Sequence, residues 1–115
     1  METFETKEQT PEFTIKISTE ASLEGIIKKL SDGDFIEFIA TKSQDLWLSN
    51  IGHDSMTKHD GIDWEDVTVD GHCRIETDQI LTSIFYGYRG SNEVRSSVKQ
   101  SLAAFVKNNR IKSHG

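Results

Sequence analysis

The chain has 115 residues, a formal net charge of −6 at pH 7 and a single cysteine. Apolar residues make up 35% of it and charged residues 28%, which argues against a wholly disordered, collagen-like or coiled-coil protein. A chain of this length is expected to form one domain. Residues 1–12 are polar and acidic and contain the only proline, Pro11, so we predict a flexible acidic arm at 1–12 and a single domain at 13–115.

Apolar runs are short throughout the chain. The longest, within residues 35–40, is about five residues long, whereas a membrane-spanning helix needs roughly twenty. The first eight residues are acidic, where a signal peptide would be basic and then apolar. We therefore expect a cytoplasmic protein without a membrane partner, in which the unpaired Cys73 is a small buried apolar residue.

Charge is distributed unevenly. Residues 91–115 carry one acid, Glu93, against five basic side chains, and the rest of the chain is strongly acidic. An acidic body repels phosphate backbones. The sequence therefore argues against a nucleic-acid partner, except through the C-terminal segment.

The first half of the domain contains a strand, a helix and two further strands. Residues 13–17 alternate apolar and polar, which is typical of a half-buried strand. Ser18 or Thr19 is a candidate N-cap, and Gly33 a candidate terminator, of a helix over about 19–31. The apolar face of this helix comprises Leu23, Ile26, Ile27 and Leu30.

Two strands are expected next, at 35–39 and 46–48, joined by a turn at 41–45. Glu37 lies within the first of them. We expect its carboxylate to face outward or lie at an edge; the alternative is burial, which would raise its pKa. Residues 49–66 show no sustained periodicity and predict a long loop, a feature that is often functional when ordered.

The second half is expected to be a hairpin, a strand and a helix. Asp70-Gly71 is a hairpin signal, and a three-residue connection would pair Val69 with Cys73 and Val67 with Ile75. Another strand follows at 80–86. A helix over about 92–109 has an apolar face with an adjoining basic strip. That face comprises Val94, Val98, Leu102, Phe105 and Val106, and the strip Arg95, Lys99, Lys107 and Arg110.

Strands joined mostly by hairpins, with one helix near each end, predict the α+β class. We expect a strongly bent antiparallel sheet of about five strands, covered by the two helices.

The sequence offers little for catalysis. His53, His59 and Asp60 are residues that zinc accepts as ligands, but their spacing matches no closed metal site. No nucleophile elbow or phosphate-binding loop is present. We predict no enzyme activity, no metal and no cofactor; a small metal-dependent enzyme is the least favoured alternative.

The strongest binding signal lies in the long loop. Trp64 is flanked by Asp60, Asp63, Glu65 and Asp66. Tryptophan supplies a large contact area, and carboxylates steer a basic partner toward it. The alternative is that Trp64 and Ile62 fold back to close one end of the core.

A second binding signal lies near the C-terminal helix. Aromatic residues followed by basic ones can stack on unpaired bases; the alternative is aromatic packing across strands. The residues concerned are Tyr86, Tyr88, Arg89, Arg95 and Lys99.

A helix followed by segments 34–40, 46–48 and 75–84 resembles the Sm-like and SH3-like small barrels, over roughly residues 20–86. The resemblance implies bent hairpins and, for the Sm-like family, ring oligomers that bind single-stranded RNA. The chain lacks the Asp-x-x-Met-Asn loop feature, and residues 75–80 match the closing motif only in part. Its size and acidity are also similar to those of small inhibitors from phages and mobile elements.

Together these features predict a non-enzymatic regulator or inhibitor. It would bind a basic surface of another protein through the acidic loop around Trp64. The runner-up is an Sm-like protein that binds single-stranded nucleic acid. The sequence leaves the oligomeric state open.

Overall fold

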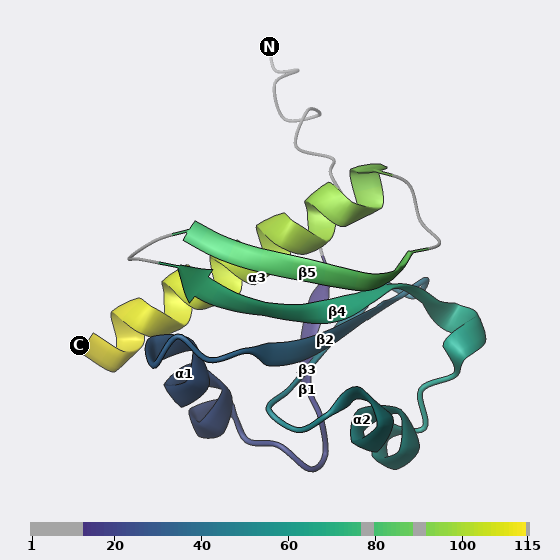
Figure 1. The fold of residues 1–115 in the computed structure, drawn as a ribbon, viewed down its shortest axis with the longest axis horizontal. Helices are drawn as coiled ribbons and strands as arrows, with labels where there is room; N and C mark the ends of the chain where they lie inside the picture. Colours follow the sequence, from purple (N-terminus) through teal and green to yellow (C-terminus); the bar gives the residue numbers. More distant parts are fainter. Residues whose placement is uncertain (1–12, 77–79, 89–91, 115) are drawn as a thin grey trace.

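A computed structural model describes residues 13–76, 80–88 and 92–114 of the chain. Within these residues the protein is an α+β domain, as the sequence predicts, built on one open sheet (Figure 1). In chain order its elements are β1 (Thr14–Ile17), α1 (Leu23–Ser31), β2 (Ile36–Thr41), β3 (Asp45–Ser49), α2 (His53–Asp60), the 3-10 helix η2 (Trp64–Asp66), β4 (Val67–Glu76), β5 (Ile80–Tyr88) and α3 (Asn92–His114).

The sheet is mixed, which corrects the prediction of a purely antiparallel one. Its strand order is β1-β3-β2-β4-β5, so β1 and β5 form its edges within the described chain. β1 runs parallel to β3, with Ile15 opposite Leu46, and the other neighbours are antiparallel. The chain leaves β1 through α1 and returns as β2, and the β2–β3 turn then places β3 between the two.

The first helix begins later than expected. Ser22, rather than Ser18 or Thr19, is its N-cap, and the Ser22 hydroxyl accepts a hydrogen bond from the Gly25 N–H at 3.0 Å. Ser18 is buried instead, and its N–H donates to the Leu48 carbonyl as an extension of the β1–β3 pairing. The predicted end is confirmed, because Gly33 has the left-handed conformation at φ 79°.

The predicted hairpin at Asp70-Gly71 is wrong, because these residues lie inside the continuous strand β4. β4 pairs with β2 on one side and β5 on the other, and Gly71 lies opposite Phe38. The register to β5 shifts between Asp70 and Gly71. The Asp-Gly pair thus lies opposite a bulge in β5, where Tyr86 is skipped, and the two rows of strand pairing outweigh the local turn preference.

The predicted loop at 49–66 contains α2 and η2. α2 escapes sequence analysis because Met56 is its only fully buried residue, so it lacks an apolar stripe. Its signals are terminal: Asp54 in the first turn, and Gly61 just after the last turn in the left-handed conformation at φ 68°.

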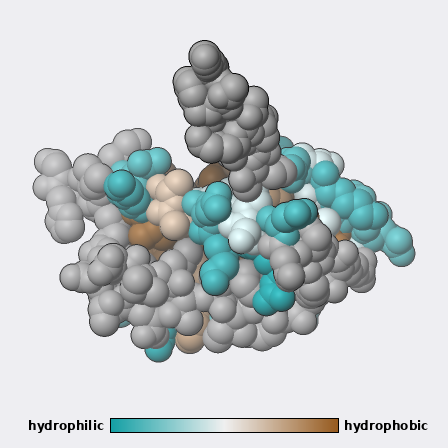
Figure 2. Space-filling model, turned by 90° about the horizontal axis from the view of Figure 1, so that it is seen from above, coloured by the Kyte–Doolittle hydropathy of each residue, from teal (hydrophilic) through white to brown (hydrophobic). Residues whose placement is uncertain are grey.

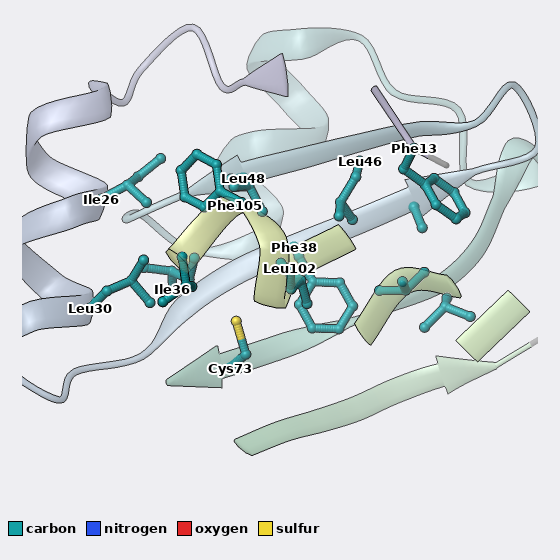
Figure 3. Packing of buried hydrophobic residues seen from close by; sticks show 14 residues of the cluster. Phe13, Ile26, Leu30, Ile36, Phe38, Leu46, Leu48, Cys73, Leu102 and Phe105 are labelled. Atoms are coloured by element: carbon teal, nitrogen blue, oxygen red, sulfur yellow. The ribbon is translucent and has the colours of Figure 1, made fainter. Parts of the chain in front are cut away.

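α1 and α3 cover one face of the sheet. Ile26 and Leu30 from α1 and Leu102 and Phe105 from α3 meet alternate sheet residues such as Phe38, forming the main core (Figure 3). Cys73 lies in this core and is fully buried, which confirms its predicted role. α3 extends past the predicted residue 109 to His114 and buries the predicted apolar face.

α2 covers part of the opposite face. Successive residues of a strand point to opposite sides, so Ile39 leaves the main core and packs with Met56 and Val67 in a second, small cluster. Trp47 and Ile62 are partly buried against it. Figure 2 shows a different side of the molecule, where the described residues are mostly hydrophilic and apolar areas are small.

Candidate functional site

The predicted acidic loop forms a defined surface, which we call the Trp64 face: Asp63, Trp64, Glu65 and Asp66. The Trp64 side chain remains 41% exposed, and the three acids beside it are exposed. Asp63 is the N-cap of η2, and its carboxylate accepts a hydrogen bond from the Glu65 N–H at 3.0 Å. The capped turn therefore holds an aromatic ring among carboxylates at the surface.

Trp64 and Ile62 differ in how far their side chains are buried. Ile62 packs against the second cluster, as the alternative interpretation of the sequence expects, whereas Trp64 stays largely outside it. Ile62 thus anchors the segment and leaves Trp64 presented.

Asp60, the fifth predicted residue of this site, is half-buried at the end of α2. Its Oδ1 accepts a hydrogen bond from the Thr19 N–H at 2.9 Å. The neighbouring His59 lies 3.3 Å from the Glu20 carboxylate. These two contacts tie the end of α2 to the β1–α1 connection, so Asp60 positions the Trp64 face.

A hollow of about 170 Å³ lies beside this face and is called the acidic pocket here. None of the described residues that line it is basic. At its border, Lys16 Nζ lies 3.6 Å from Asp45 Oδ2 and 5.5 Å from the centre of the Trp47 ring. A cation on this wall thus meets both a carboxylate and an aromatic face. The acidic pocket is lined by Asp45, Asp60, Asp63, Asp66, Trp47 and Ile62, among others.

A second polar group, not predicted from the sequence, lies between α2 and the sheet. We call it the histidine cluster: Glu37, His53, Asp70 and His72. His53 Nδ1 lies 3.2 Å from Glu37 Oε1, and His53 Nε2 lies 3.6 Å from Asp70 Oδ2. Glu37 is opposite His72 in the β2–β4 register, and its Oε2 lies 3.9 Å from His72 Nδ1. Glu37 is thus half-buried between two imidazoles, neither simply outward nor fully buried.

The histidine cluster is linked to the Trp64 face. The ring centres of His53 and Trp64 are 6.4 Å apart in an edge-to-face arrangement. At the opposite end of the cluster, the Phe35 ring packs edge-on against the His72 ring, and the two ring centres are 4.5 Å apart. The Arg74 guanidinium lies over the Phe35 ring, 4.9 Å from its centre. One polar row therefore runs from β4 across β2 to the exposed tryptophan.

The geometry bears on two possible chemistries, a reactive cysteine and a bound metal ion. Burial, and then the nearby Glu37 carboxylate, raise the pKa of the Cys73 thiol to about 12, so it remains protonated and unreactive at neutral pH. No three His, Cys, Asp or Glu residues within the described ranges form a group that could hold a metal ion. The two histidines of the predicted metal site have different carboxylate partners. His53 lies beside Glu37 and Asp70, whereas His59 lies beside Glu20.

The residues of the predicted nucleic-acid site are placed only in part. Tyr86 and Tyr88 belong to β5, and Arg89 lies outside the described residues. Arg95 is half-buried and Lys99 exposed in the first half of α3.

Comparison of the chain with protein families, with curated proteins and with solved structures finds no match. Among the described residues, no helix is both long and apolar enough to cross a membrane. The resemblance to Sm-like and SH3-like barrels stays a prediction.

The histidine cluster was missed because Asp70 was assigned to a turn. Had residues 67–76 been recognised as one strand, Asp70, His72 and Arg74 would have formed a polar row on one side of it. Such a row on a central strand is itself a signal of a polar site.

Proposed function

We propose that this protein is a non-enzymatic regulator or inhibitor that binds a basic surface of another protein through the Trp64 face. The observation that carries the proposal is a 41% exposed tryptophan among exposed carboxylates on a capped turn. Interfaces concentrate their binding energy in aromatic anchors. Acidic neighbours add association rate and specificity toward a basic partner.

The acidic pocket supports the same partner chemistry. A lysine or arginine side chain is long enough to reach into a shallow hollow and would meet Asp63 and Asp66 there. The contact of Lys16 with Asp45 and Trp47 shows within the chain how this wall receives an ammonium group. A basic surface with a protruding lysine or arginine is therefore the expected partner feature.

The proposal is tested by comparing capture of proteins from source-cell lysate by the wild type and by Trp64→Ala. Leu23→Ala is the matched control, because Leu23 is also a large apolar residue at the surface, 44% exposed. We expect Trp64→Ala to weaken capture of a specific protein at least about tenfold, as for a hot-spot residue. Equal loss in both variants, or loss in neither, would contradict the proposal.

The charge requirement has its own test. We expect Asp63→Asn, Glu65→Gln and Asp66→Asn together to slow association with the captured protein and to flatten its salt dependence. Asparagine at position 63 retains an oxygen that can cap η2. The control variant neutralises three exposed acids elsewhere, Glu24, Asp32 and Asp34, and is expected to keep the wild-type rate.

The runner-up function, binding of single-stranded RNA, is tested in parallel with labelled oligouridine. Affinity that falls steeply with rising salt and is lost in Lys99→Gln would favour that alternative.

A further inference from the structure

Both ring nitrogens of His53 face carboxylates, and the two carboxylates come from different strands. Glu37 of β2 approaches Nδ1 at 3.2 Å, and Asp70 of β4 approaches Nε2 at 3.6 Å. The Phe38 carbonyl oxygen is also 3.4 Å from Nε2. All three neighbours are acceptors, so the site presents oxygen on both sides of the ring.

A neutral imidazole cannot serve both sides at once. It has one N–H donor and one acceptor nitrogen, whereas the protonated ring has two donors. In the neutral form, one nitrogen lone pair would face a carboxylate oxygen. Only the protonated ring gives each carboxylate an N–H and a counter-charge.

Water has little room to relieve this mismatch. The Asp70 side chain is only 8% exposed. Glu37 Oε1 is buried, and although it lies at ion-pair distance from Nδ1, it has no aligned hydrogen bond among the described residues. Buried acceptors without donors are costly, so the protonation state of His53 matters for the contact between α2 and the sheet.

The charged and titratable groups around His53 come from each packed element. Glu37 is on β2, Asp70 and His72 are on β4, and η2 contributes the uncharged Trp64 ring. Asp54 follows His53 on α2 and is exposed. Two carboxylates thus share two imidazoles, and His53 is the one carried by the helix α2.

We propose that His53 is a pH-sensitive latch: its protonated ring fastens α2, and with it the Trp64 face, to β2 and β4. Protonation of the ring strengthens this docking, and loss of the proton loosens it. The latch itself needs no partner. Its consequence, tighter partner binding at lower pH, rests on the proposed function.

The test follows Trp64 fluorescence from pH 8.5 to 5.5 in the Trp47→Phe variant, where Trp64 is the only tryptophan. A charged imidazole beside the indole alters its emission, so we expect one sigmoidal transition. His53→Gln should lose the transition. His59→Gln, which removes a half-exposed histidine paired with Glu20, should keep it.

A second variant guards against misfolding of His53→Gln. Glu37→Gln leaves the imidazole in place and removes one carboxylate, so the transition should move to lower pH. A flat profile in Trp47→Phe, or a transition that persists in His53→Gln, would overturn the latch. A shift to higher pH in Glu37→Gln would do the same.

The latch and the proposed function can fail separately. If the transition depends on His53 while Trp64→Ala leaves protein capture unchanged, the latch stands and the proposed function fails. If Trp64→Ala abolishes capture while fluorescence is flat with pH, the function stands and the latch fails.

Discussion

The two faces of the sheet are built on different principles. Under α1 and α3, a continuous apolar core contains Phe38, Leu102 and Cys73, supplied by helices with clear apolar stripes. Under α2, a small cluster around Ile39 and Met56 adjoins polar contacts centred on His53. The first face provides most of the burial, and the second carries the exposed tryptophan and the titratable groups. The main core that stabilises the fold therefore lies on one face of the sheet, and the candidate binding site lies on the other.

The largest expected effect compares one core residue from each face. Phe38 and Met56 are both fully buried. We expect Phe38→Ala to lower the free energy of unfolding by about 4 kcal/mol and Met56→Ala by about 2 kcal/mol, since the partly buried Trp47 and Ile62 can close around the smaller cavity. Urea unfolding measures both. A greater loss in Met56→Ala would break the distinction between the faces.

The core face has a pH limit set by Cys73. The folded thiol keeps its proton up to a pKa of about 12, whereas the unfolded thiol loses it above its ordinary 9.0. The folded state then binds more protons, so this group lowers stability as pH rises from 9 toward 12 and has no effect below 9.

At pH 10.5 this contribution is about 2 kcal/mol relative to neutral pH. The measurement is the change in unfolding free energy between pH 8 and 10.5 in the wild type and in Cys73→Ala. The variant should lose less over that interval. Equal losses would show that Cys73 does not set the limit.

The smallest expected effect concerns the Trp64 face itself. Neutralising Asp63, Glu65 and Asp66 together should change the free energy of unfolding by less than about 0.5 kcal/mol, because exposed charges contribute little to stability. Thermal unfolding measures it. A loss of unfolding free energy well above 1 kcal/mol would mean that these acids stabilise the fold, which would contradict a role in binding alone.

Prediction from sequence succeeded where burial is periodic. The apolar row of α3, the row of α1 apart from the exposed Leu23, and the turn between β2 and β3 follow from spacing alone, because a helix or strand that buries one side must repeat its apolar residues. Prediction from sequence was wrong where the local preference of a segment differs from the conformation that its tertiary contacts impose. Asp70-Gly71 favours a turn in isolation, and only pairing with β2 and β5 makes it part of a strand.

The candidate site divides in the same way. The aromatic and acidic composition of residues 60–66 predicted the Trp64 face, and the structure adds that Asp60 positions it and Ile62 anchors it. The full histidine cluster did not follow from the sequence, because Asp70 was assigned to a turn and because Glu37, His53 and Asp70 are far apart in the chain and meet only across paired strands and α2.

The sequence by itself determined the α+β class, the main core and the acidic character of the Trp64 face, because composition and periodicity act locally. Only the tertiary structure decided the parallel placement of β1, the continuity of β4 and the position of His53 between two carboxylates. Each of these depends on contacts between segments distant in sequence, whose combined pairing and burial outweigh the preference of any single segment.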